Sequence, residues 1–259
     1  MADPDLTEAH LDDRSEAPEG AVFPEGAAVN SSDEVAVLET VMRRRRSVRG
    51  FLETPVPAGT LRSIFELAQT APSNCNVQPW RVYLASGETR DRVRAALLGV
   101  VGAAGGPVEP PRPDFDLGAS FQGEYRRHQV ECAVALYREI GVERGDAEGR
   151  LKAFQRNYAL FDAPHVAFIG MDKSFGPSVV VDVGIYLGQL MLLLTAHGIA
   201  CCPMGSLRNY PDVVRAELGV PEEIGLLVGL CFGYEDPAVP ANRTRTTRAP
   251  VTDNVRFFE

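Results

Sequence analysis

Two short stretches of the chain carry residues that could bind a charged ligand. Residues 43–51 read Arg-Arg-Arg-Arg-Ser-Val-Arg-Gly-Phe, which places five arginines within seven positions. A guanidinium group stays charged and presents a rigid fork of donors, so such a cluster suits phosphate or another bidentate anion. Residues 71–80 read Ala-Pro-Ser-Asn-Cys-Asn-Val-Gln-Pro-Trp and add small polar side chains on a backbone restricted by proline. Together the stretches indicate a pocket for a phosphorylated, partly aromatic ligand.

Each stretch also has a simpler interpretation. The arginines could form a solvated surface or a nucleic-acid patch, and some could only complement the C-terminal dipole of a preceding helix. The residue types at 73–76 are common turn formers. Within the arginine run we rank Arg45, Ser47 and Arg49 first as ligand contacts and Arg46 next, and we assign Arg43 and Arg44 to the surface.

The elements that must position these residues follow from periodicity. Val35, Leu38 and Met42 share one helical face and predict a helix that begins near residue 31 and ends in the arginines. A second helix is expected over residues 57–69 and is stopped by Pro72. Further along, the patterns predict helices over 90–98, 119–140, 176–197 and 210–218, and strands over 80–85, 165–170, 199–202 and 225–233.

Two of these segments invite a specific interpretation. In the helix at 119–140, apolar and aromatic residues at helical spacing indicate a core face, so His128 is not expected to act as a base. The Gly/Pro-rich stretch 102–118 is long for a connection in a compact domain, which favours a loop at the substrate entrance; a tolerated surface insertion is the alternative.

Composition bounds the class of protein. The chain has 259 residues, is 45% hydrophobic and 24% charged, and carries a net charge of -9. Residues 1–30 hold eight acidic residues against one arginine and few large apolar residues, which predicts a disordered acidic leader followed by one domain over residues 31–259. The leader lacks the basic and apolar regions of a secretory signal. A sequence pI of about 5.1 disfavours a nucleic-acid-binding module.

The apolar run 183–196 is shorter than the roughly 20 residues that a bilayer requires, so we interpret it as a buried helix and expect no membrane association. A helix that is apolar nearly all round needs cover on every side, which a subunit interface would supply. The five cysteines are odd in number and lack a C-x-x-C spacing, which fits neither a disulfide framework nor a zinc site. We therefore expect no metal and a reducing, cytoplasmic location.

The two motifs, read as Arg-Arg-Ser-x-Arg-x-Phe and Ala-Pro-Ser-x-x-Asn-x-Gln-Pro-Trp, resemble those of the FMN-dependent nitroreductase family. The resemblance continues at residues 202–206, Cys-Pro-Met-Gly-Ser, and along the C-terminal arm from Arg243 to Val255. Residues 157–164, which lead into the strand at 165–170, together with the Ile140-Gly141 junction, are similar to the nitrobenzoate and nitrophenol reductase branch.

The resemblance implies an α+β, nitroreductase-like fold: a mixed sheet flanked by helices, in an intertwined homodimer whose C-terminal arm crosses to the partner. It implies bound FMN, reduction by NADPH or NADH, and ping-pong hydride transfer to a nitroaromatic or similar small aromatic acceptor. The flavin carries the hydride, so no catalytic side chain is implied. The implied FMN contacts are Arg45, Arg46, Ser47, Arg49, Arg245 and Arg248 in one subunit, Pro72, Ser73, Asn74 and Asn76 from the other, and Pro203, Met204 and Gly205 near the flavin N5.

The sequence departs from the family at Gly205-Ser206, where many members carry an acidic residue followed by glycine. This departure concerns the ring side of the flavin. Two alternatives keep the cofactor: a flavin-dependent dehydrogenase or oxidase of a biosynthetic pathway, and a non-catalytic flavin-binding sensor.

Overall fold

The computed structural model of the protein describes residues 31–102, 108–118 and 120–259. Contacts divide the chain into two units, Met1–Leu38 and Glu39–Glu259. Helix α1, Ser31–Arg44, begins in the first unit and ends in the second. The acidic leader expected over residues 1–30 lies outside the described residues, so the domain boundary at residue 31 stays a prediction.

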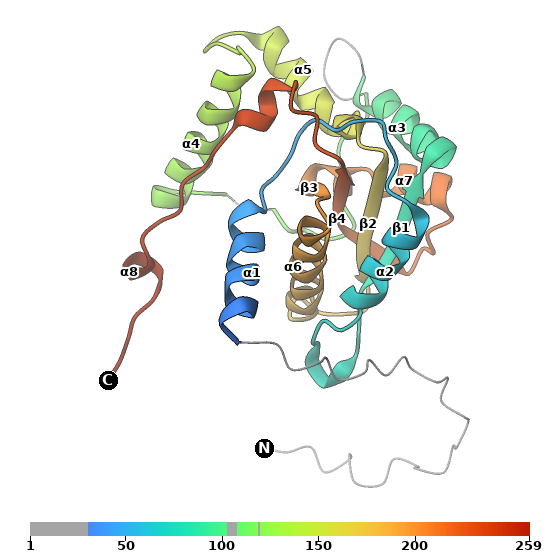
Figure 1. Ribbon diagram of the computed structural model, residues 1–259. Helices are drawn as coiled ribbons and strands as arrows, with labels where there is room; N and C mark the ends of the chain where they lie inside the picture. The colour runs from blue at the N-terminus through green and yellow to red at the C-terminus, as the bar shows by residue number, and fades with distance from the viewer. Residues whose placement is uncertain (1–30, 103–107, 119) are drawn as a thin grey trace, which may run out of the picture. The chain divides into compact units, whose positions relative to one another are not determined.

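The second unit is built on a four-stranded sheet in the order β1-β2-β4-β3 (Figure 1). All three strand pairings are antiparallel. The expectation of a mixed sheet is therefore corrected for these four strands; a parallel contact is made by Ser47, in the arginine segment, through an isolated bridge to Cys201 of β3. The strands are β1 Arg81–Ser86, β2 His165–Asp172, β3 Ala200–Met204 and β4 Ile224–Gly233.

Both faces of the sheet are covered, and the alternation of β2 shows why. Val166 and Phe168 pack into one apolar cluster, whereas Ala167 and Ile169 pack into a second cluster on the opposite face. Successive strand residues point to opposite faces, so a strand that is apolar throughout requires helices on both sides.

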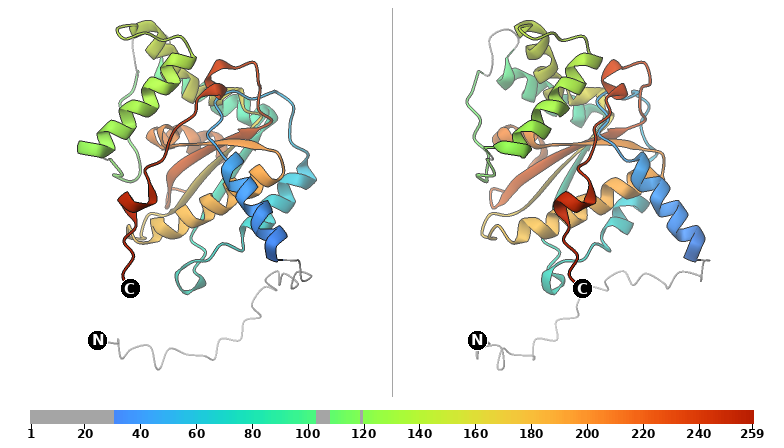
Figure 2. Two further views of the ribbon diagram at one scale, coloured as in Figure 1. Left: turned by 60° about the vertical axis from the view of Figure 1, so that its left-hand side comes forward. Right: turned by 90° about the vertical axis from the view of Figure 1, so that its left-hand side faces the viewer.

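The helices supply that cover (Figure 2). Helices α2 and α6 pack against each other on one face, and α3, α5 and α7 lie on the other. The C-terminal arm follows β4 and ends in the short helix α8, Val251–Asn254. The remaining helices are α2 Ala58–Ala68, α3 Gly87–Val101, α4 Gly123–Glu139, α5 Ala147–Tyr158, α6 Val179–Ala196 and α7 Pro211–Leu218.

Helix α6 buries only one side within its own chain. Tyr186 and Leu190 are fully buried, whereas Val181 and Ile185 are exposed. The helix has 18 residues and a mean hydropathy of 1.9, which by length and composition would allow it to cross a membrane. Its packing against α2, β2 and β3 makes it a core helix whose second apolar side is uncovered in the single chain.

One expectation for the middle of the chain needs correction. Helix α4 forms where it was predicted, but none of its residues is buried, so the apolar stripe is not a core face. The described end of the 102–118 loop is tied down beside β4: the Asp114 carboxylate forms an ion pair with the Arg215 guanidinium at 2.6 Å and accepts the Leu226 N–H at 2.8 Å. These contacts attach the described end of the loop to the rest of the protein, and its expected position at the substrate entrance stays a prediction.

Candidate functional site

The segment that carries the arginines is held on the sheet by its own backbone. The Val48 N–H donates to the Cys201 carbonyl at 3.1 Å, and the Leu52 N–H donates to the Tyr234 carbonyl at 2.9 Å. Val48 and Phe51 are buried between these anchors. The apolar residues of the motif therefore fix the segment, and the side chains of Arg45 and Arg49 do not serve as its anchors.

Asn242 ties this segment to the start of the C-terminal arm. Its Oδ1 accepts the Arg49 N–H at 2.7 Å, and its Nδ2 donates to the carbonyls of Gly50 and Asp236, each at 2.8 Å. The arm approaches so closely that a Cβ on Gly50 would come within 2.5 Å of the Val239 side chain. Only glycine fits at this crossing.

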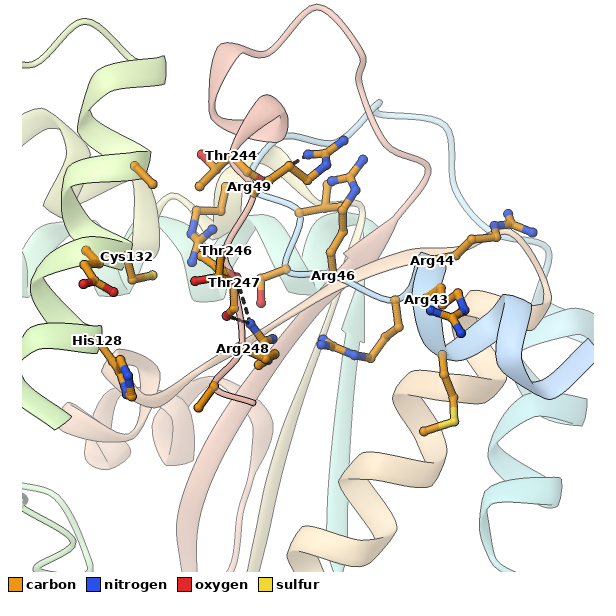
Figure 3. A pocket seen from close by; sticks show the side chains of 18 of the residues that line it. Arg43, Arg44, Arg46, Arg49, His128, Cys132, Thr244, Thr246, Thr247 and Arg248 are labelled. Carbon is orange, nitrogen blue, oxygen red and sulfur yellow. Dashed lines mark hydrogen bonds between the residues drawn. The ribbon is translucent and has the colours of Figure 1, made fainter. Parts of the chain in front are cut away.

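An open cavity of about 1640 Å³ lies beside this crossing (Figure 3). One wall is the end of α1 with the arginine segment, another is the arm, and the third is α4, whose His128 and Cys132 are drawn across from Arg248. The cavity is open to solvent and is larger than the roughly 300–1,000 Å³ typical of enclosed small-molecule sites.

The charge in this cavity is strongly positive. Within residues 31–102, 108–118 and 120–259, no carboxylate forms an ion pair with five of the arginines that line it, namely Arg44, Arg45, Arg49, Arg245 and Arg248. Arg245 and Arg248 each use one nitrogen, Nη1, to donate to the backbone of the arm. Unpaired like charges repel one another, so the cavity favours a polyanion.

Arg46 differs from its neighbours. Its Nη2 donates to both carboxylate oxygens of Glu235, and both side chains are partly buried. The pair joins the arginine segment to the residues after β4. Because Glu235 already neutralises the charge of Arg46, this arginine holds the segment in place and is less suited to bind an anion than its unpaired neighbours.

The structure brings together six of the predicted ligand contacts and leaves seven apart. The six that line the cavity are Arg45, Arg46, Ser47, Arg49, Arg245 and Arg248. The seven that do not are Pro72, Ser73, Asn74, Asn76, Pro203, Met204 and Gly205. Arg43 and Arg44 line the cavity as well, although we assigned them to the surface; Arg43 is exposed and pairs with Glu39.

The loop that carries Asn74 has the turn geometry allowed for in its simpler interpretation. The Ser73 Oγ accepts the Gln78 N–H at 2.9 Å, which closes the loop. Cys75, Asn76 and Gln78 all have positive φ, between 48° and 56°. The side chains at 74–76 are exposed. Such a loop presents polar groups outward, away from its own subunit's cavity.

Residues that the sequence reasoning missed come from the arm and from α4. Thr246 and Thr247 line the cavity between the two arm arginines, where Thr-Arg-Thr-Thr-Arg over residues 244–248 was an available signal. Tyr125, His128 and Cys132, which we interpreted as part of a core stripe, line it from α4 together with Glu124.

Thiol chemistry has little support beside the arginine segment. Burial raises the pKa of the Cys201 thiol to about 12, and burial likewise raises the pKa of Cys202, although the nearby Arg49 charge opposes it. Neither thiol supplies a thiolate nucleophile near neutral pH. Among the described residues, no group of His, Cys, Asp or Glu side chains could hold a metal ion.

Residues 42–234 match the nitroreductase family, and the chain belongs to that family. The fold agrees: it is α+β, with an antiparallel sheet flanked by helices. The chain is similar to nitroreductase NfnB of Mycolicibacterium smegmatis, with 38% identity over 236 residues that cover 91% of this chain and 97% of the relative. It is 30% identical over 229 residues to a 4-nitrobenzoate reductase of Nocardioides sp., with 86% and 91% covered.

Two solved structures of nitroreductases are also similar to this chain. The crystal structure of the FMN-dependent nitroreductase NfnB from Mycobacterium smegmatis in complex with NADPH superposes with a TM-score of 0.83 at 37% identity, and covers 88% of this chain and all of that one. The FMN- and NADPH-dependent nitroreductase NfnB from a Sphingopyxis strain matches with a TM-score of 0.79 at 34% identity, with 86% and 99% covered.

Proposed function

We propose that the protein is an FMN-dependent oxidoreductase that takes hydride from NADPH and reduces nitroaromatic acceptors by a ping-pong mechanism. The observation that carries the proposal is the set of unpaired guanidinium groups around one cavity, in a chain at least 30% identical over most of its length to named nitroreductases. NADPH is favoured over NADH because both closely similar solved structures are described with NADPH.

The residues present fit FMN. Its phosphate carries close to two negative charges, which Arg49, Arg45 and the arm arginines would neutralise with charge-assisted hydrogen bonds. Ser47, on the same fixed segment, supplies a hydroxyl for the pyrimidine edge of the ring. Arg46 holds the segment in place through Glu235. Residues 203–205 remain our candidates for the ring side, although they lie outside the cavity.

A homodimer would complete this site. The loop at 72–76 does not line the cavity of its own chain, yet it presents exposed amide side chains on a strained backbone. Helix α6 leaves Val181 and Ile185 exposed, which supports burial against a second copy. In the proposed dimer, the loop of one subunit meets the cavity of the other, and the C-terminal arm crosses to the partner.

When bound, FMN supplies the two-electron chemistry, accepting hydride from the nicotinamide and passing it to the acceptor. The protein contributes binding and electrostatics: the arginines favour the anionic phosphate, and surplus positive charge at the cavity favours further anionic ligands such as NADPH. No side chain is proposed as a nucleophile or strong base. The five cysteines, all free thiols in the structure, support the proposed cytoplasmic location.

The test is an anaerobic visible spectrum of the FMN-loaded protein before and after NADPH or NADH, followed by 4-nitrobenzoate. We expect NADPH to bleach the flavin band and the nitro compound to restore it. A flavin that no nicotinamide bleaches would favour the dehydrogenase or sensor alternatives. A protein that does not hold FMN would contradict the proposal outright.

A further inference from the structure

The loop at Ser73–Gln78 holds an unfavourable backbone conformation. Cys75 has φ of 48°, Asn76 of 56° and Gln78 of 50°. Residues with a Cβ adopt this left-handed region at a cost of about 1–3 kcal/mol each, so surrounding contacts must hold the loop in place. Its exposed side chains contribute little packing, so the contacts that hold the loop must involve its backbone.

One such contact comes from a buried carboxylate on α6. The Asp182 side chain lies in the first turn of that helix, and its Oδ2 accepts the Asn74 N–H at 3.3 Å. Asp182 is only 8% exposed. Within the described part of the chain it forms no ion pair. A buried carboxylate requires hydrogen bonds to offset its desolvation, and the loop amide provides one.

Asp182 does not serve its own helix as a cap. Ser178 is the N-cap residue of α6, and no side-chain hydrogen bond caps the helix. The helix dipole favours a negative charge in the first turn. That effect does not explain why the Asp182 carboxylate also accepts a hydrogen bond from the loop.

One turn further along the same face, Tyr186 stacks on Trp80 with ring centroids 4.8 Å apart. Trp80 lies just after the loop, and its Nε1–H donates to the Gln69 side chain at 2.9 Å. Helix α6 therefore contacts both sides of the strained loop, through the Asn74 amide before it and the Trp80 ring after it.

We propose that Asp182 is a positioning residue for this loop, and that it holds Asn74 and Asn76 in the conformation in which they meet the flavin bound to the partner subunit. The proposal rests on the proposed function, because the flavin contact of the loop is part of it. Since α6 also carries the uncovered apolar side, the same helix would link subunit contact to loop geometry.

The test combines two measurements on Asp182→Ala: amide hydrogen exchange over residues 73–78, and the FMN dissociation constant of the apoprotein by fluorescence quenching. We expect loop exchange to accelerate and the dissociation constant to rise by roughly tenfold, the effect of about one hydrogen bond. Asp182→Asn keeps an acceptor oxygen and should restore both values to within about threefold of wild type. Asp182→Leu also removes the acceptor, but its apolar side chain suits the buried position. It should give the same two changes and therefore provides the test if Asp182→Ala folds poorly.

The matched control is Tyr186→Phe, one turn away on the same face. It removes a hydroxyl that has no hydrogen-bond partner among the described residues and keeps the ring that stacks on Trp80. Both measurements should stay at the wild-type values. Unchanged loop exchange in Asp182→Ala and Asp182→Leu, or equal losses in Asp182→Asn, would overturn the inference. Failure of the wild-type protein to bind FMN would instead overturn the proposed function.

Discussion

Two of the segments that bring arginines to the cavity differ in how firmly they are held. The segment at 45–51 is bonded to β3 and to the residues after β4, and its apolar members are buried. The arm at 245–248 is exposed, and within the described part of the chain its arginines donate hydrogen bonds only to neighbouring residues of the arm. One half of the anion site is thus preorganised by the fold, whereas the other half is free to adjust.

Because of this difference, arginines on the two segments should contribute unequally to the affinity for an anion. A guanidinium on a fixed segment loses little conformational entropy when it binds, so more of its interaction energy appears as affinity. A guanidinium on an exposed arm loses more entropy and is screened by solvent. We therefore expect the fixed segment to dominate the binding of the phosphate.

The largest expected effect follows from cutting the connection between the two segments. Asn242→Ala removes three hydrogen bonds and leaves the Arg49 N–H without its acceptor, whereas the carbonyls of Gly50 and Asp236 keep the N–H donors of Asp236 and Val239. We expect the free energy of unfolding to fall by about 3 kcal/mol, measured by urea denaturation. Arg243→Gln, at the exposed neighbouring position, should change it by less than about 1 kcal/mol. Equal effects would show that Asn242 does not hold the site together.

Acid should lower the free energy of unfolding through protonation of His165. His165 is buried beside the start of β2; its Nε2 accepts the Val56 N–H at 2.9 Å, and its Nδ1 lies 2.6 Å from the Ser86 hydroxyl. Burial, with a contribution from the Arg90 charge, lowers the pKa of His165 from 6.5 to about 4.

The unfolded chain therefore takes up this proton first, and the contribution to stability is complete above pH 6.5 and lost as the pH falls toward 4. The loss should reach at most about 3 kcal/mol, measured by denaturation at several pH values. In His165→Gln this part of the pH dependence should disappear. An unchanged pH profile in that variant would refute the assignment.

The next two predictions compare the FMN affinities of variants at one arginine of the 45–51 segment and one arginine of the arm. Arg49→Met should raise the FMN dissociation constant by about 10- to 100-fold, since it removes a charge-assisted hydrogen bond from the preorganised side. Arg138→Met serves as the control, because that exposed arginine pairs with Glu139 and lies outside the cavity. Its FMN affinity should equal that of wild type in the same fluorescence titration.

The smallest effect is expected on the arm. Arg248→Met should raise the FMN dissociation constant by no more than about fivefold, the value of an exposed ionic contact. A larger loss than in Arg49→Met would reverse the comparison and make the arm the principal phosphate ligand.

The sequence predicted most helices and strands but missed α5, Ala147–Tyr158, whose polar and glycine-containing first turns look like a loop. The helix over residues 57–69 has a clear apolar periodicity, and the strands near 165 and 225 are short apolar runs bounded by proline or glycine. The face of α4 was misjudged because apolar spacing shows which residues share a side and does not show what that side meets. The loop at 73–76 was assigned to the other subunit's flavin only through the family resemblance, and that assignment stays a prediction because the structure describes a single chain. Thr246 and Thr247 were missed because threonine carries no strong binding signal by itself.

The account depends on the claim that the unpaired arginines bind the phosphate of a flavin. The most direct measurement compares the dissociation constants of FMN and riboflavin for the apoprotein, since the two ligands differ only in that phosphate. We predict that FMN binds about 100-fold more tightly or better, and that the ratio falls toward one in Arg49→Met. Equal affinities for both ligands in the wild-type protein would contradict the account.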